Sequence, residues 1–150
     1  ALALMQLAMG KSAHGWLALA GGAVFLGHIF PVWLGFKGGK GVATAAGAII
    51  MLAPKVVPVM VLVFVLVVAI WKYVSLASIV LAAIFPGVSW ALYPDRHALL
   101  MFSFATAVLV IWRHRSNIGR IRRGEEHKIT FRRRTWDELK HRREQESGER

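Results

Sequence analysis

Cysteine is absent from this 150-residue sequence, which excludes disulfide bonds, thiolate zinc sites and iron–sulfur clusters held by the chain. Six histidines are present, but none has the HExxH spacing, so a dedicated metal site has little support. The N-terminal stretch ALALMQLAMGK lacks the basic start that a signal peptide needs. We interpret it as the end of a helix that begins upstream of the sequence.

Acidic residues are also scarce over most of the chain. Residues 1–112 contain one acid, Asp95, and six Lys or Arg, whereas the last 38 residues contain the other 13 basic and 7 acidic side chains. The chain is 56% hydrophobic with a mean hydropathy of +0.50, which is too apolar for an ordinary soluble domain of this size. An apolar body with a basic tail indicates an integral membrane protein.

Five apolar segments follow this helix stub, which occupies residues 1–10. A membrane-spanning helix needs about 20 apolar residues, or somewhat fewer where the bilayer adapts. The second segment is short, and Pro54 and Pro58 bracket its join to the third. The sequence predicts an all-α integral membrane protein with about five transmembrane helices, one of them short. The predicted helices cover residues 15–34, 42–53, 56–71, 74–92 and 97–112.

The uneven charge also predicts orientation and domain organisation. Basic residues favour the cytoplasmic side, so the tail from Arg113 onward lies there with the 35–41 loop and the Trp71–Tyr73 turn. A re-entrant second segment would change this parity. Residues 1–120 are expected to form an N-terminally incomplete membrane domain, and residues 121–150 a basic, partly disordered cytoplasmic tail.

A glycine-rich, cationic loop, GFKGGKG at residues 35–41, interrupts the apolar sequence before the second segment. Glycines at the start of a helix leave backbone N–H groups unpaired at the positive end of the helix dipole. They also permit positive φ and close approach of an oxyanion. Lysine charge and a nearby hydroxyl complete a site that suits phosphate. The residues predicted to form it are Gly38, Gly39, Lys40, Gly41 and Thr44.

Two other interpretations of this loop are weaker. A Walker A motif needs four residues between its glycines, then Gly-Lys followed by Ser or Thr, all after a strand. Here Gly41 follows Lys40, and the preceding segment is helical. The glycines alone would favour close helix packing, as small residues do in membranes. Lys37 and Lys40 among them favour anion binding instead.

A second polar motif, RHRSNIGR at residues 113–120, follows the last apolar segment. If the helix continues, Arg113, Asn117 and Arg120 share one face, and His114 lies one turn from Asn117. Arginine binds phosphate through two parallel hydrogen bonds, while His and Asn orient a hydroxyl or a carbonyl. A juxtamembrane basic anchor is the alternative, and it leaves the His–Asn pair unexplained.

Two serines and a further histidine lie near the same predicted end. Ser75 and Ser78 share a helical face, where serines usually hydrogen-bond a neighbouring helix or their own backbone. His28 precedes the Phe30–Pro31 break and is expected to be a packing residue rather than a base.

Three stretches of the sequence carry a family resemblance. GHIFPVWLGFKGGKGVAT at 27–44, YVSLAS at 73–78 and WRHRSNIGRIRRGEEHKI at 112–129 resemble, in order and spacing, the bacterial acyl-phosphate:glycerol-3-phosphate acyltransferases (the PlsY family). The resemblance covers about residues 15–130 and implies a seven-helix enzyme of the bacterial inner membrane with a cytoplasmic active site. Such enzymes transfer an acyl group from acyl phosphate to the 1-hydroxyl of glycerol 3-phosphate. The products, lysophosphatidic acid and phosphate, begin phospholipid synthesis.

The resemblance also implies roles for individual residues. It assigns Lys40, His114 and Asn117 to catalysis, while Glu126 matches a carboxylate that supports the structure. One phosphate is expected at the glycine loop, and the other substrate near Arg120. The implied partners are acyl phosphate, glycerol 3-phosphate and membrane lipids, with no cofactor, metal, nucleic acid or obligate protein partner. The implied substrate-binding residues are Gly38, Gly39, Gly41, Ser75, Ser78 and Arg120.

The resemblance leaves one segment unmatched and one alternative open. Family members carry a further helix and a polar motif with a functional serine before the matched region, which needs roughly 65 more residues. We therefore expect the 150 residues alone to be inactive. The alternative is a small transporter or channel with an anion site at an interrupted helix. It predicts inverted repeats, and the apolar segments show none.

Overall fold

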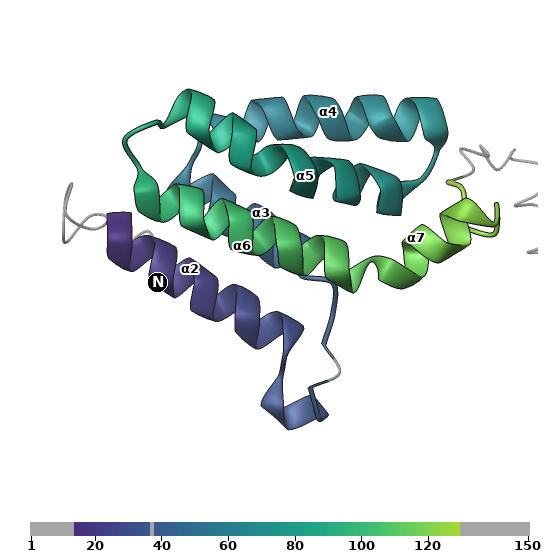
Figure 1. Ribbon diagram of the computed structural model, residues 1–150, viewed down its shortest axis with the longest axis horizontal. Coiled ribbons are helices and arrows are strands. Elements are labelled where there is room, and N and C mark those ends of the chain that lie inside the picture. Colours follow the sequence, from purple (N-terminus) through teal and green to yellow (C-terminus); the bar gives the residue numbers. More distant parts are fainter. Residues whose placement is uncertain (1–13, 37, 130–150) are drawn as a thin grey trace, which may run out of the picture.

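The structure, a computed structural model, describes residues 14–36 and 38–129. Helices make up most of these residues, and no strand occurs among them (Figure 1). The predicted stub at 1–10 and the tail beyond residue 129 lie outside the described ranges. The elements are α2 (His14–Ile29), the 3-10 turn η2 (Val32–Leu34), α3 (Val42–Leu52), α4 (Val56–Trp71), α5 (Val74–Leu92), α6 (His97–Arg113) and α7 (Arg115–Arg122).

The helix ends follow the proline and glycine signals in the sequence. α2 ends at Ile29, earlier than the expected residue 34, because Pro31 disfavours helix in the residue before it, and η2 follows as a short turn. α3 begins after Gly41, whose φ of 77° is a left-handed conformation that favours glycine. The other boundaries lie within two residues of the predicted ones, so the expected all-α architecture is confirmed.

Helices α2 to α6 alternate in direction along the bundle (Figure 1). The α3–α4 join meets the α5–α6 turn at one end, which we call the far end. There Arg96 Nη1 donates to the Leu52 carbonyl at 3.1 Å. The near end carries the 30–41 connection, the α4–α5 turn and α7. α3 therefore runs antiparallel to both of its chain neighbours, and the basic segments that charge predicts on one side share the near end.

The lengths of the apolar helices differ. Among the described residues, segment 15–34, with a mean hydropathy of 1.8, and α5, with 1.9, are long and apolar enough to cross a membrane. α6 and α7 meet this test only as a pair, bent by 54°. α3 and α4 are apolar but shorter, at 11 and 16 residues. At about 1.5 Å per residue, α4 extends about 24 Å, somewhat less than the hydrocarbon thickness.

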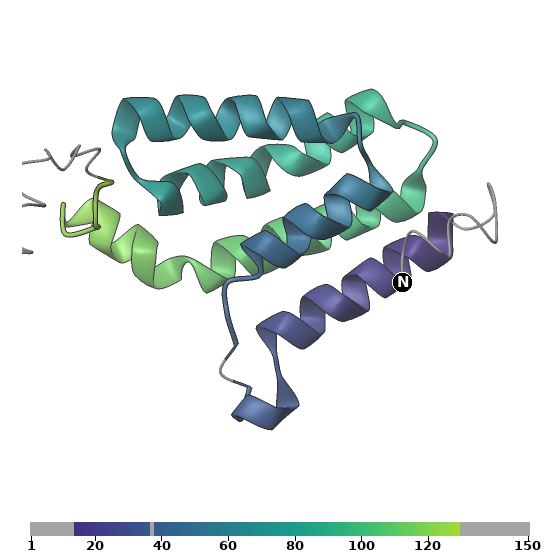
Figure 2. The same ribbon diagram turned by 180° about the vertical axis from the view of Figure 1, so that it is seen from behind.

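Large apolar side chains lie on the outside of the bundle as well as inside. Trp33 is 95% exposed and Met101 75% exposed, which suits a surface that faces lipid rather than water. Inside, Phe102 of α6 packs edge-on against Phe25 of α2 and Phe85 of α5, with ring centroids 6.5 and 6.2 Å away. Seen from behind, α3 lies against α6, between α2 and α4 (Figure 2). The bundle is therefore an integral membrane architecture.

The helix does not continue through the basic motif after α6, which corrects the expectation from sequence. It bends by 54° where His114 separates α6 from α7. Arg113 consequently hydrogen-bonds to the glycine loop, whereas Asn117 and Arg120 bind a carboxylate beyond α7. The three residues do not share one face, because a bend changes the directions in which the side chains on either side of it point.

The chain turns back after α7, and we call residues 124–129 the return segment. Gly124 has a φ of 71°, a left-handed conformation that reverses the chain direction. The backbone N–H of Ile129 then donates to the carbonyl of Lys72 in the α4–α5 turn at 2.8 Å. The first residues of the predicted basic tail therefore pack against the near end of the bundle.

Candidate active site

A polar cavity of about 740 Å³ lies at the near end of the bundle. The start of α3, the start of α5, the α6–α7 joint and the return segment contribute to its walls. The predicted site residues that line it are Lys40, Gly41, Ser75, Ser78, His114 and Asn117. The predicted site residues that do not line it are Gly38, Gly39, Thr44 and Arg120.

The start of α3 faces this cavity through Gly41, Val42 and Ala43. Gly41 is the N-cap residue and makes no side-chain cap, so the first N–H groups of the helix are not satisfied in that way. Among the described residues, no backbone carbonyl outside the helix accepts from the N–H groups of Val42 and Ala43. Unpaired N–H groups and the positive helix end together favour an anion here, and Lys40 adds a charge.

Gly38 and Gly39 allow the loop to lie against the end of α2. A Cβ at Gly38 would collide with the carbonyl oxygens of His28 and Ile29, and one at Gly39 would lie 2.5 Å from His28 Nε2. Neither residue has a positive φ, unlike Gly41. Their lack of a side chain therefore serves close packing of backbone, rather than the positive φ expected from the sequence.

Arg113 holds the loop in place from the end of α6. Its Nε donates to the Gly39 carbonyl at 3.1 Å, and its Nη2 donates to the Gly38 carbonyl. In a trans peptide unit the N–H points opposite to the C=O, so the N–H groups of Gly39 and Lys40 point away from Arg113. Arg113 thus fixes the loop by its carbonyls and leaves these N–H groups free of that contact.

His114 is 1% exposed and lies at the joint between α6 and α7. Its Nδ1 is 2.8 Å from the Val110 carbonyl oxygen, which can only accept a hydrogen bond. We therefore assign the proton of the neutral ring to Nδ1, which leaves Nε2 with a lone pair. Because His114 also lines the cavity, this imidazole is suited to accept a proton from a bound hydroxyl.

Asn117 is held by a carboxylate of the return segment. Its Nδ2 donates to Glu126 Oε1 at 2.6 Å, and the Nε of Arg120 donates to Glu126 Oε2 at 2.7 Å. Asn117 is 2% exposed, and its Oδ1 has no hydrogen-bond partner among the described residues. The amide therefore presents a free acceptor at the cavity, while Arg120 binds Glu126 from outside the lining.

Glu126 stays ionised in this network. Burial of its side chain, which is 7% exposed, would by itself raise the carboxyl pKa. Hydrogen bonds from Asn117 and Arg120, the Arg120 charge and the nearby Ser75 hydroxyl outweigh burial and lower the pKa of Glu126 from 4.5 to about 2. The carboxylate therefore fixes Asn117 and α7, which agrees with the supporting role that the resemblance implies for Glu126.

The two serines of α5 differ in how their hydroxyls are used. Ser78 Oγ donates to the Val74 carbonyl of its own helix at 3.0 Å. Ser75 Oγ is buried and has no partner within hydrogen-bond geometry among the described residues. Both serines line the cavity, but only the hydroxyl of Ser75 is free to bind a ligand.

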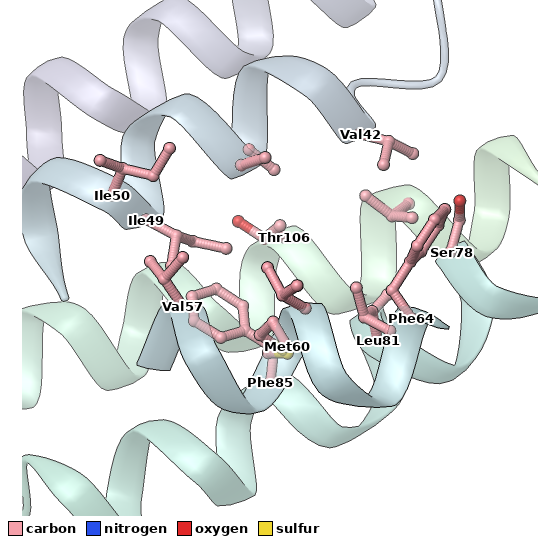
Figure 3. Close-up of a pocket in the computed structure, with 15 residues that line it drawn as sticks. Val42, Ile49, Ile50, Val57, Met60, Phe64, Ser78, Leu81, Phe85 and Thr106 are labelled. Atoms are coloured by element: carbon pink, nitrogen blue, oxygen red, sulfur yellow. The ribbon is translucent and has the colours of Figure 1, made fainter. Parts of the chain in front are cut away.

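An apolar groove of about 310 Å³ adjoins the polar cavity between α3, α4, α5 and α6 (Figure 3). Apart from Ser78 and Thr106, apolar side chains line it, including Ile49, Met60 and Phe85. The residues that line both the groove and the polar cavity are Val42, Ala46, Phe64 and Ser78. The two spaces therefore share a boundary beside the start of α3.

Three further residues line the cavity without having been predicted for the site. His28, which the sequence predicts to be a packing residue, is exposed and lies against the cavity next to Gly39. His127 and Lys128 follow directly after the paired glutamates of the GEEHK stretch, and that adjacency is the signal that points to them. In the described part of the chain, no group of three His, Asp or Glu side chains is placed to hold a metal ion.

These features together define a class of protein. A bundle of apolar helices carries a cationic polar cavity at one end, and the cavity adjoins an apolar groove. Such a pair of spaces suits an amphiphile that has an anionic head and a hydrocarbon chain. The protein is therefore of the class of integral membrane proteins that act on, or bind, anionic lipids.

Comparison with known proteins identifies the family. Residues 1–124 match the family described as Glycerol-3-phosphate acyltransferase, and the chain belongs to this family. The glycerol-3-phosphate acyltransferase of Syntrophomonas wolfei is 47% identical over 105 residues, which cover 70% of this chain and 53% of that protein.

Two solved structures of PlsY, an integral membrane glycerol 3-phosphate acyltransferase, are also similar. Its glycerol 3-phosphate form has a TM-score of 0.65 and 41% identity, covering 71% of this chain and 52% of that one. Its lysophosphatidic acid form has a TM-score of 0.66 and 37% identity, covering 71% and 54%. The chain thus spans about half the length of these relatives.

Proposed function

We propose that the protein transfers a fatty acyl group from acyl phosphate to the 1-hydroxyl of glycerol 3-phosphate, giving lysophosphatidic acid and phosphate. The observation that carries this proposal is the shared boundary between the polar cavity and the apolar groove. One space suits phosphorylated groups and the other suits an acyl chain. Both ligands named for the solved relatives, glycerol 3-phosphate and lysophosphatidic acid, fit this combination.

In this reaction the acceptor hydroxyl oxygen attacks the carbonyl carbon of acyl phosphate. A new ester C–O bond forms, the C–O bond to phosphate breaks, and phosphate leaves with the bonding electrons. His114 Nε2 takes the proton of the hydroxyl, because Nδ1 is already bound to Val110. Acyl phosphate is an activated anhydride, so positioning and electrostatic stabilisation supply much of the acceleration.

The start of α3 is the site for a phosphoryl group. Lys40 supplies a charge, and the unpaired N–H groups at the first turn supply directed donors. Ser75 and Asn117 supply a free hydroxyl and a free amide oxygen for the glycerol hydroxyls. The acyl chain lies in the groove beside Val42 and Phe64.

The near end of the bundle faces the cytoplasm of a bacterial cell, and the helices lie in the inner membrane. Support comes from the basic residues of α7 and of the chain beyond it, because cytoplasmic loops carry an excess of Lys and Arg. Both soluble products and substrates would then enter and leave from the side where they are made and used.

The proposal is tested by a transfer assay with palmitoyl phosphate and radiolabelled glycerol 3-phosphate in proteoliposomes. It uses the chain alone and a chimera that joins it to the N-terminal portion of the S. wolfei relative. We expect labelled lysophosphatidic acid from the chimera. Absence of product in both proteins, together with phosphate uptake into vesicles containing either of them, would contradict acyl transfer and support the transporter alternative.

A further inference from the structure

Two phosphorylated substrates need two places for anionic charge. The first place is the start of α3 with Lys40. The sequence predicts Arg120 for the second, but the Nε of Arg120 is bound to Glu126, and Arg120 does not line the cavity. A phosphate group carries close to two charges, so a single cation leaves the second substrate uncompensated.

The return segment brings two other basic residues to the cavity. It is fixed on one side by Glu126, which binds Asn117 and Arg120, and on the other by the hydrogen bond from Ile129 N–H to the Lys72 carbonyl. Between these two anchors lie positions 127 and 128. Anchoring on both sides gives these positions a defined location relative to the bundle.

His127 and Lys128 both line the polar cavity. The ammonium of Lys128 lies 5.5 Å from the centroid of the Tyr73 ring, a cation–π contact that restricts where the charge can go. Neither residue lines the apolar groove, so their side of the cavity is accessible to a polar head without a chain passing it. No carboxylate of the described residues forms an ion pair with Lys128.

We propose that Lys128, with His127 beside it, forms a second anion subsite that binds the phosphate group of the substrate not held by Lys40. The inference rests on the proposed function, because it assigns one of two phosphorylated substrates to the return segment. Lys128 supplies the charge, and His127 supplies a ring N–H donor. The phosphate comes from either glycerol 3-phosphate or acyl phosphate, and the experiment distinguishes them.

The far end of the bundle offers a matched control for Lys128. Lys55 is also exposed, and its ammonium lies 5.8 Å from the centroid of the Tyr93 ring. The two lysines therefore share their chemistry and their aromatic contact. They differ in that Lys128 lines the cavity and Lys55 does not.

The test measures ligand binding to the protein in nanodiscs of neutral phosphatidylcholine, by isothermal titration. The two ligands are glycerol 3-phosphate and a β-keto phosphonate analogue of palmitoyl phosphate, which cannot transfer its acyl group. Lys128→Gln should weaken one ligand by about tenfold, as expected for one lost charge-assisted contact, and change the other by less than about twofold. Lys128→Arg should keep most of the affinity, and Lys55→Gln should bind like the wild type.

The ligand weakened by Lys128→Gln identifies the phosphate that occupies the subsite. Unchanged affinity for both ligands, equal weakening of both, or the same effect from Lys55→Gln would overturn the subsite. Equal weakening would mean that Lys128 acts only through the overall field of the basic surface. If the wild type binds neither ligand, the proposed function fails with it, whereas normal wild-type binding without a Lys128 effect removes the subsite alone.

Discussion

The two ends of the bundle contain similar side chains but use them differently. At the far end the cations have protein partners: the Arg96 guanidinium lies 4.4 Å from the centroid of the Tyr93 ring, and Lys55 packs on the same ring. At the near end, Ser75 Oγ and Asn117 Oδ1 are buried with no hydrogen-bond partner among the described residues. The far end is closed by its own contacts, and the near end is left open for a ligand.

This difference separates a binding site from a basic surface. A buried polar group without a partner costs about 1–3 kcal/mol, so it persists where a ligand or water can complete it. Arg96 serves structure, because it also donates to the Leu52 carbonyl near the end of α3. The number of cations at an end therefore says less about function than the number of polar groups that lack a partner.

The largest effect is expected from Lys40→Ala in the chimera. Turnover of palmitoyl phosphate with glycerol 3-phosphate should fall about 10²- to 10³-fold, because a phosphoryl group at the start of α3 loses its ammonium partner. The unfolding temperature should hardly change, since Lys40 is exposed. Lys55→Ala is the matched change at the far end and should be nearly silent. Similar losses in both variants would remove the functional difference between the ends.

Arg113→Lys sharpens the comparison by keeping charge and removing the guanidinium fork. Lysine cannot donate to the Gly38 and Gly39 carbonyls in the same paired way, so the loop should shift relative to the cavity. We expect kcat to fall about 10- to 100-fold with a smaller change in KM. Arg115→Lys is the control, because Arg115 is exposed and stacks on Trp112 at 4.7 Å. Normal kcat in Arg113→Lys would show that the loop needs no such anchor.

Glu126 gives a pH dependence with a definite sign. Its folded pKa, about 2, lies below the ordinary 4.5. The stabilisation by its carboxylate is therefore complete above pH 4.5 and is lost as the pH falls towards 2. Glu126→Gln should lower the free energy of unfolding at neutral pH by about 1–3 kcal/mol and flatten its pH dependence across this window.

Glu125→Gln is the control for this measurement, made by thermal unfolding in detergent from neutral to acidic pH. Glu125 pairs with Arg123 on the surface, where both side chains are more than half exposed, 56% and 60%. Such a pair contributes little, so this variant should follow the wild type. If Glu125→Gln destabilised the protein as much as Glu126→Gln, the buried network would not be the cause.

The smallest effect is expected from the serine pair of α5. Ser75→Ala removes a free hydroxyl from the cavity and should raise the KM for glycerol 3-phosphate several-fold, about the value of one hydrogen bond. Ser78→Ala removes a hydroxyl already bound to Val74 and should leave KM nearly unchanged. Steady-state kinetics of the chimera measures both. A larger effect from Ser78→Ala would reverse the assignment.

The helices and the loop before α3 were predictable from local sequence. Apolar runs interrupted by Pro and Gly define where helices begin and end, and Pro31 accounts for the early end of α2. Gly41 is the N-cap that the glycine-rich loop predicts. These features depend on residues close together in the chain.

The bend at His114 and the return segment were not predictable in the same way. No Pro or Gly lies at the bend, which coincides with contacts from Arg113 to a loop about 75 residues earlier in the chain. The return segment is charged and resembles a solvated tail in composition. Its position depends on long-range contacts of Glu126 with α7 and of Ile129 with Lys72. Arg120 was therefore expected at the cavity in the place where Lys128 lies.

The lack of cysteine permits a direct test of the central claim, that a phosphoryl group binds at the start of α3. Ala43→Cys places a single thiol on the cavity wall in the first turn of that helix, and His97→Cys places one at the far end. The rate of alkylation in nanodiscs is measured with and without glycerol 3-phosphate or the phosphonate analogue. At ten times its Kd, one of these ligands should slow modification of Ala43→Cys about tenfold and leave His97→Cys unaffected. Unchanged alkylation of Ala43→Cys by both ligands at saturation would contradict the account.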